Sequence, residues 1–273
     1  MAGMTGGSID LRGPALRIPT LCLRWGVLGY CIGVAGTTLR FGDELAETLN
    51  MDIGWSWEDS LAVASVGCWV LLTAAVLQMI SRRAWPVLVF ISGWSALLTV
   101  AAYLQHGGEP FREVLLISHS SRWLVPLALC LFLACPKSGA VPLARITKGI
   151  WLLRIAAAVI FAMHGYEALG HKSSFIDYIL MAGQRVGMSI SQEVACSALT
   201  WVGVIDMLLA LLVLTTRWRF ILAYMAFWGL VTAGARIVHS GLVRWDEFFL
   251  RAPNFCVPLA LFFYWRFFAR RSQ

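Results

Sequence analysis

The stretch HGYEALGH, residues 164–171, places two imidazoles and a carboxylate at spacings of three and four. On an α-helix, His164, Glu167 and His171 would therefore share one face. Imidazole and carboxylate groups can exchange protons with a bound molecule, and both can ligate metal ions. The stretch ends the run WLLRIAAAVIFAM, which has the composition of a membrane-spanning helix. Any chemistry here must therefore take place inside a membrane or at its surface.

Two further apolar segments carry ionisable groups of a similar kind. Asp206 lies in the middle of one segment, and Arg236 and His239 lie three residues apart near the end of another. An ionisable group at the centre of a membrane costs about 2.5–3.5 kcal/mol, so such groups usually face the interior of a helix bundle. We therefore expect a shared polar pocket that opens to the outer surface. The candidate binding residues are His164, Glu167, Asp206, Arg236 and His239.

These groups also have structural interpretations. Glu167 and Arg236 can form an ion pair that only stabilises the bundle, because unpaired charge is rarely tolerated in lipid. His171 can be an exposed loop residue, and His239 can bind backbone carbonyls at a helix end. Arg154, in the first turns of its apolar segment, can extend towards the inner phosphates of the bilayer. Asp206 is harder to explain in this way, because its short side chain reaches neither surface.

The composition indicates an all-α integral membrane protein. Hydrophobic residues make up 59% of the chain and charged residues only 14%, which is outside the range of soluble domains. Eight segments are long enough, or nearly so, to cross about 30 Å of hydrocarbon. The expected spans are 21–38, 61–80, 85–104, 114–135, 151–169, 197–214, 220–238 and 247–265.

The distribution of charge predicts the orientation of these spans. If the N-terminus is cytoplasmic, every inner loop carries Lys or Arg, and nearly all acidic residues fall on the outer face. Both termini are then cytoplasmic, and we expect an integral protein of a bacterial inner membrane in contact with lipid. The net charge of +7 follows from this topology and does not indicate nucleic-acid binding.

The chain also contains an internal repeat with a period of about 130 residues. LRWGVLGYCIGVAG (23–36) resembles LRIAAAVIFAMHG (153–165), and Pro126 and Pro258 occupy corresponding positions. Because each copy has an even number of spans, the two four-helix repeats should run parallel. The expected divisions are a polar tail (1–20), a first repeat (21–136), a cytoplasmic linker (137–149), a second repeat (150–266) and a basic tail (267–273).

The polar residues are concentrated in the second repeat. Where this repeat has MHGYEAL, the first has VAGTTLR, and Tyr103 stands at the position that corresponds to Arg236. The first repeat should therefore act as a well-packed scaffold, and the second should hold the polar cavity. Between its first two spans, the sequence SSFIDYILMAGQ predicts a short amphipathic helix on the membrane surface.

The second repeat resembles the DoxX-like superfamily of four-helix membrane proteins. The matching features are Arg154 in the first span, His164–Gly165 followed by Glu167, Asp206 in a Leu-rich second span, and the Thr216–Arg217 turn. The resemblance covers residues 150–265, and it reaches residues 20–135 only through the internal repeat. It implies the four-helix fold. The superfamily includes membrane subunits attributed to thiosulfate:quinone oxidoreductase, methylamine-utilisation proteins, and cargo or chaperone membrane proteins, so the activity stays open.

Three functions are compatible with these features. The first is a membrane subunit associated with electron transfer, in which a quinone head group binds the outward-facing pocket. Imidazole and carboxylate groups would exchange its protons, and Arg236 would stabilise an anionic form of the ring. The second is a non-catalytic scaffold or assembly subunit that packs against other membrane subunits. The third is a small-solute or ion transporter that uses Asp206 for proton coupling. Whether the protein is an enzyme is not decided by these residues.

Other cofactors have weaker support in the sequence. Haem b needs two axial ligands from opposing helices, and His164 with His239 is the pair that we would propose. The order HxxExxxH matches no zinc-protease motif, and the seven cysteines include no CxxC pair. We therefore assign no metal ligands.

The predicted orientation can be tested by accessibility labelling in intact cells or oriented vesicles. Residues 137–148 should label only from the cytoplasmic side and residues 172–190 only from the outer side. Labelling of both segments from one side would contradict the eight-span topology and the parallel repeats.

Overall fold

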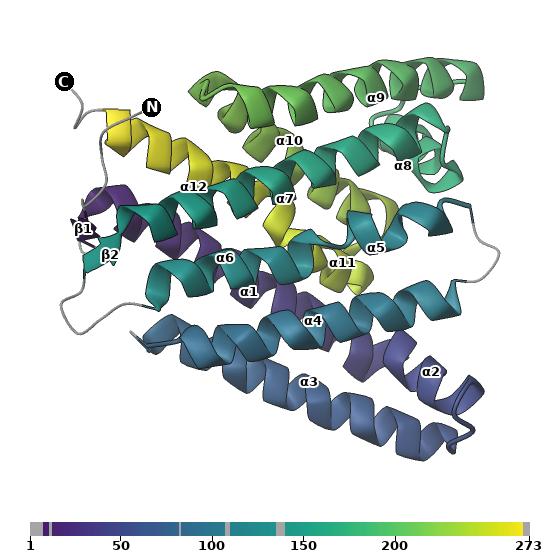
Figure 1. Ribbon diagram of the computed structural model, residues 1–273. Coiled ribbons are helices and arrows are strands. Elements are labelled where there is room, and N and C mark those ends of the chain that lie inside the picture. The colour runs from purple at the N-terminus through teal and green to yellow at the C-terminus, as the bar shows by residue number, and fades with distance from the viewer. Residues whose placement is uncertain (1–7, 11–12, 82, 107–109, 135–139, 270–273) are drawn as a thin grey trace.

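The computed structural model describes residues 8–10, 13–81, 83–106, 110–134 and 140–269. Seven helical segments in these ranges are long and apolar enough to cross a membrane, and an eighth span would be a pair of helices bent by 46°. The chain thus has the architecture of an all-α membrane protein, in agreement with the composition. Figure 1 shows the helices packed lengthwise in one bundle.

The two halves of the described chain have the same order of elements. Each half begins with a long helix and a short helix, continues with two long helices, and ends with a 3-10 turn and two further helices. The first half contains α1 (Pro14–Phe41), α2 (Glu44–Met51), α3 (Trp57–Ile80), α4 (Trp85–Gln105), η1 (Arg112–Val114), α5 (Leu115–Ser118) and α6 (Ser121–Leu133). The second half contains α7 (Leu143–Leu169), α8 (Ser173–Arg185), α9 (Gln192–Thr215), α10 (Arg219–Ser240), η2 (Leu242–Arg244), α11 (Trp245–Leu250) and α12 (Ala252–Ala269).

Two of the long helices begin before the apolar segments that predicted them. α1 starts at Pro14 instead of near residue 21, and α7 starts at Leu143 instead of near residue 151. Hydropathy marks only the part of a helix that lies in hydrocarbon, whereas Arg and Lys are themselves good helix formers. In front of these helices, the strand β1 (Ser8–Asp10) pairs antiparallel with β2 (Ala140–Pro142). This ribbon, the starts of α1 and α7 and the end of α12 lie at one end of the bundle (Figure 1).

An arginine from the first helix of each half caps the end of the second long helix. Arg24 of α1 donates to the carbonyls of Met79 (2.7 Å) and Ser81 (2.8 Å) at the end of α3. In α7, Arg154 is only 5% exposed. It donates to three carbonyls at the end of α9, those of Val213 (2.8 Å), Leu214 (2.6 Å) and Thr216 (2.8 Å). The last carbonyls of a helix have no partner within the helix, and a cation is favoured there. These arginines therefore bind helix ends, and the lipid-phosphate interpretation of Arg154 does not fit its buried side chain.

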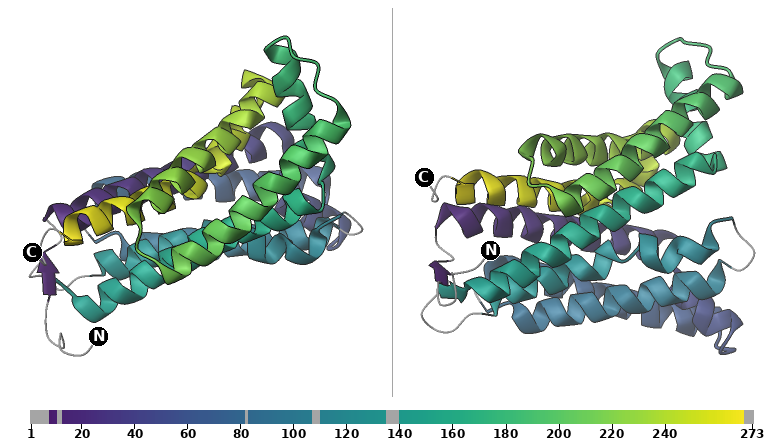
Figure 2. Two further views of the ribbon diagram at one scale, coloured as in Figure 1. Left: turned by 90° about the horizontal axis from the view of Figure 1, so that it is seen from above. Right: turned by 45° about the horizontal axis from the view of Figure 1, so that its top comes forward.

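The two halves interlock through their first and last helices. α1 packs along α11 and α12 of the second half, and α7 packs along α5 and α6 of the first half. Within the first half, α1 contacts α3, and α4 contacts α6. The second half repeats this arrangement, with α7 against α9 and α10 against α12. The two views in Figure 2 show α1 and α12 side by side. Each half thus contributes a long helix to the interior of the other.

Glycines make the contact between α1 and the second half unusually close. Gly26, Gly29, Gly33 and Gly36 lie along the face of α1 that meets α11 and α12. A Cβ atom at Gly33 would lie 2.4 Å from the backbone nitrogen of Leu250, and one at Gly26 would lie 2.8 Å from Cβ of Cys256. Small residues at such spacings allow the backbones of membrane helices to approach closely. Because the neighbour at Gly33 is backbone, no side-chain rotation can make room there.

Gly33→Ala should therefore separate α1 from α11 and destabilise the protein by about 1–3 kcal/mol, as overpacking of a tight core does. The matched control is Gly93→Ala in α4, because a Cβ at Gly93 meets nothing within 4 Å. The control should unfold at the wild-type temperature or slightly above it. Thermal unfolding of the purified variants measures both effects, and equal stability of the two would contradict this packing.

Candidate functional site

A small polar cavity lies inside the second half, among α7, α9, α10 and α12. Its lining residues are Ile160, Phe161, His164, Asp206, Trp228, Gly229, Thr232 and Asn254. The cavity volume is about 10 Å³, which is enough for roughly one water molecule. Two of the five candidate binding residues, His164 and Asp206, thus face the same space. The polar residues that complete the lining, Trp228, Thr232 and Asn254, were not among the candidates.

Asp206 is the most unusual group in this cavity. Asp206 is 3% exposed, and none of the residues that the structure describes forms a hydrogen bond with its Oδ1 atom. The Trp228 side chain is within hydrogen-bonding reach of the carboxyl group. Leaving a buried acceptor unpaired costs about 1–3 kcal/mol. The described side chains give this oxygen no partner, so a molecule in the cavity would have to supply one.

The position of Asp206 depends on a glycine contact one turn earlier in α9. A Cβ at Gly203 would lie 2.9 Å from the carbonyl oxygen of Gly165 in α7, and a Cβ at Gly165 would lie 2.9 Å from the carbonyl oxygen of Gly203. The two backbones are therefore nearly in contact. This approach brings the polar face of α9 against the face of α7 that carries His164.

The aromatic side chains of α8 lie beside His164. The His164 ring lies 6.0 Å from the Phe175 ring, measured between centroids. α8 packs on both α9 and α10, and Gly183 is its one buried residue. The helix was expected from the sequence at this place. Through Phe175, α8 therefore lies beside the part of α7 that carries His164.

Arg236 and His239 belong to a second layer, next to α8 and outside the cavity lining. Arg236 is 9% exposed, and its guanidinium lies 4.3 Å from the centroid of the Tyr178 ring. The Tyr178 ring also packs edge-on against the His239 ring, with 5.0 Å between the ring centroids. Cation–π contacts of this kind stabilise a buried arginine. They leave the Nε atom of Arg236 without a hydrogen-bond partner.

Glu167 does not form the ion pair that the sequence allowed. Its carboxylate binds Lys172 at 2.6 Å, and within the described part of the chain no ion pair joins it to Arg236. The helix ends at Leu169, and His171 adopts a positive φ of 52° that turns the chain back over the helix end. This turn brings Lys172 to Glu167, which residue spacing alone could not reveal.

The turn also separates the three groups of the HGYEALGH stretch. His171 leaves the helical face and lies exposed in the turn after α7, as its interpretation as a loop residue expected, with its Nε2 atom 3.0 Å from the Thr200 hydroxyl. His164 faces the cavity, and Glu167 faces Lys172. Across the described ranges, no three His, Cys, Asp or Glu side chains gather closely enough to hold a metal ion.

The haem hypothesis does not fit the positions of the two histidines. Two aromatic side chains of α8 connect them, in a series of ring contacts from His164 to Phe175 (6.0 Å), to Tyr178 (6.2 Å) and to His239 (5.0 Å). A haem would need the two imidazoles on opposite sides of one ring plane. Side chains already fill the space between them.

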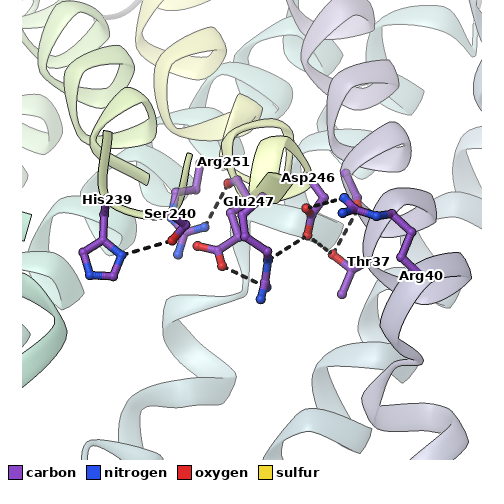
Figure 3. A network of polar contacts seen from close by, with 9 residues as sticks. Thr37, Arg40, His239, Ser240, Asp246, Glu247 and Arg251 are labelled. Atoms are coloured by element: carbon purple, nitrogen blue, oxygen red, sulfur yellow. Dashed lines mark hydrogen bonds and ion pairs between the residues drawn. The ribbon is translucent and has the colours of Figure 1, made fainter. Parts of the chain in front are cut away.

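Sequence reasoning missed the buried carboxylate of Asp246 in α11. The sequence places it among the outer acidic residues, yet it is 0% exposed and lies between the two halves (Figure 3). It accepts a hydrogen bond from the Thr37 hydroxyl at 2.9 Å and lies 3.4 Å from Arg40 and 3.6 Å from Arg244. The sequence feature that could have revealed this carboxylate is the face of α1, where Thr37 and Arg40 follow the glycines that allow α11 to approach closely.

Comparisons of the chain with protein-family models, with curated proteins and with solved structures find no match. Function must therefore be inferred from the site itself. A carboxyl with a free oxygen and an imidazole around a water-sized space are groups that can pass a proton between them. Strained or unsatisfied groups of this kind concentrate at functional sites.

Asp206 and Asp246 should respond oppositely to the same substitution. Asp206→Leu removes an unpartnered oxygen and should raise the free energy of unfolding by about 1–3 kcal/mol. Asp246→Leu leaves Arg40 and Arg244 without their shared carboxylate and should lower it by about 3 kcal/mol. Denaturation of both purified variants beside the wild type measures the difference. A loss of stability in Asp206→Leu as large as that in Asp246→Leu would mean that Asp206 is a structural residue.

Proposed function

We propose that the protein is an integral membrane subunit associated with electron transfer, in which the second half binds a quinone head group at the Asp206–His164 cavity. The observation that carries the proposal is the buried Asp206 carboxyl with its unpartnered oxygen beside His164. Stability alone does not account for such a group, whereas proton exchange with a bound molecule requires one.

The proposed setting is a bacterial inner membrane, with both termini in the cytoplasm and two parallel DoxX-like repeats of four spans each. Three features support the duplication: the common order of elements, the equivalent caps made by Arg24 and Arg154, and the prolines Pro126 and Pro258 in α6 and α12. The positive residues of the inner loops support the orientation.

In this proposal, each polar residue has a separate role. Asp206 holds a proton on its unpartnered oxygen, and a water in the cavity can pass that proton to His164. Trp228, Thr232 and Asn254 offer hydrogen bonds that orient the bound group. Arg236 lies one turn beyond Thr232 on α10 and supplies positive charge. A quinone would supply the two-electron chemistry.

The polar groups that line the cavity can bind a quinone carbonyl, but the cavity is too small for the quinone ring. A cavity of about 10 Å³ holds one water. Binding of a quinone therefore requires the side chains that line the cavity to move apart.

The proposal is tested by measuring how much quinone can be extracted from protein purified from its native membrane. We expect extractable quinone with the wild type and its loss with Asp206→Asn and with His164→Gln. The control is His106→Gln, which changes the counterpart of His239 in the first half and should keep the wild-type quinone content. Wild-type protein free of quinone would contradict the proposal, as would equal losses in all three variants.

The second candidate is a non-catalytic scaffold or assembly subunit of a larger membrane complex. The small volume of the cavity favours it, because a site that holds one water needs no ligand. A scaffold would co-purify with other membrane subunits and contain no quinone. Asp206→Asn would then leave its assembly unchanged.

A further inference from the structure

Three arginines without carboxylate partners converge where the last spans of the two halves are interrupted. Arg122 lies in the first turn of α6, Arg251 lies between α11 and α12, and Arg236 lies near the end of α10. Arg251 is within electrostatic range of both Arg122 and Arg236. In the described part of the chain, none of the three forms an ion pair, and the one side-chain hydrogen bond among them joins Arg251 to the Glu247 carbonyl at 2.9 Å.

The nearby carboxylates are already neutralised by other cations. Glu247 binds Arg244 at 2.8 Å, and Glu167 binds Lys172 at 2.6 Å. Asp246 contacts Thr37 and Arg40 (Figure 3) and also lies 3.6 Å from Arg244. The region therefore has more positive than negative charge, although membrane-embedded charges normally occur in pairs.

Buried polar atoms without partners accompany these arginines. They are Nε of Arg236, Oγ of Ser120 and Nδ1 of His119. Arg236 is 9% exposed and Ser120 is 7% exposed, so neither side chain can rely on water. His119 lies within electrostatic range of Arg122 and Arg251 and therefore belongs to the same cluster. Each of these groups can donate a hydrogen bond to an oxygen atom.

The interrupted spans add two helix starts to the cluster. α6 begins at Ser121, next to Arg122, and α12 begins at Ala252, next to Arg251. The two helices contact each other, and Arg122 and Arg251 beside their first turns are within electrostatic range of each other. The backbone N–H groups of Arg122, Trp123 and Leu124 already bind the carbonyls of His119 and Ser120, and that of Asn254 binds the Arg251 carbonyl. The helix dipoles therefore contribute the positive potential at these two starts, and the arginine side chains contribute the donors. In interrupted membrane helices, such ends commonly bind anionic groups.

We propose that this cluster binds a tetrahedral oxyanion of the phosphate type, contacted by Arg122, Arg236 and Arg251 between the starts of α6 and α12. Guanidinium groups match such an oxyanion because each offers two parallel N–H donors. Arg122 and Arg251 are half-buried, which gives the anion access. The phosphate can come from an anionic lipid head group or from free inorganic phosphate. This site goes beyond the proposed quinone function, since Arg122, Arg251, Ser120 and His119 have no part in the latter.

The test measures thermal unfolding of the full-length protein with two probes. The first is sodium phosphate against sodium chloride at equal ionic strength, in detergent. The second is reconstitution into phosphatidylcholine bilayers with and without phosphatidylglycerol. We expect a saturable rise in the unfolding temperature of the wild type with at least one probe. Arg122→Gln should weaken the apparent affinity by about tenfold or more, since it removes a charged hydrogen-bond donor.

Two further variants separate this site from general charge effects. Arg185→Gln, at the exposed end of α8, should keep the full response. Arg122→Lys retains the charge and should keep part of it. Arg122→Gln should also unfold no earlier than wild type without either probe, because it relieves repulsion in an unpaired cluster.

Each outcome supports or overturns the proposal. A response to phosphate alone identifies a free oxyanion, and a response to phosphatidylglycerol alone identifies a lipid head group. A wild type that responds to neither probe overturns the site, and so does an undiminished response of Arg122→Gln. Quinone content measured on the same samples keeps the two proposals apart, because Arg122→Gln should retain it.

Discussion

Hydrocarbon contains no water, so every polar group that enters the membrane must find its partner inside the protein. The clearest consequence is the pair of arginines that cap α3 and α9. Arg154 gives three hydrogen bonds to carbonyls at the end of α9, and Arg24 does the same for α3 with two. Each arginine fixes the second long helix of its half to the first. The other long helices pack against these two pairs of helices.

The same constraint explains why the two halves differ although their elements repeat. In the first half, the glycines of α1 face α11 and α12, so the small residues serve the contact between halves. In the second half, Gly165 of α7 instead meets Gly203 of α9 within the same half. That contact brings α7 and α9 together next to Asp206 and His164. A polar site thus arises in one half, while the close packing of α1 holds the halves together.

The sequence predicted the helices far better than the contacts of their polar side chains. The span expected at 85–104 is α4 (Trp85–Gln105), and that at 197–214 lies within α9, because apolar length directly reflects the hydrocarbon thickness. The interruption before α12 was not predicted, since an arginine in an apolar run does not by itself reveal a bend. The Glu167–Arg236 ion pair that the sequence allowed does not form, because the turn at His171 brings Lys172 to the Glu167 carboxylate. Trp228, Thr232 and Asn254 were missed because uncharged residues in apolar runs do not stand out.

The most informative relation in the site is between Asp206 and Arg236. Each is at least nine-tenths buried, and each has a side-chain atom without a hydrogen-bond partner, an acceptor in one case and a donor in the other. Thr232 lines the Asp206 cavity, and Arg236 follows it by four residues on the same face of α10, about one turn away. A direct ion pair would relieve both penalties, and a protein selected only for stability would be expected to form it. Instead, Arg236 stacks on Tyr178, and Asp206 faces a water-sized space beside His164. An acid and a cation that are both buried and do not pair with each other fit the proposal, in which Asp206 exchanges a proton and Arg236 supplies positive charge to a bound group.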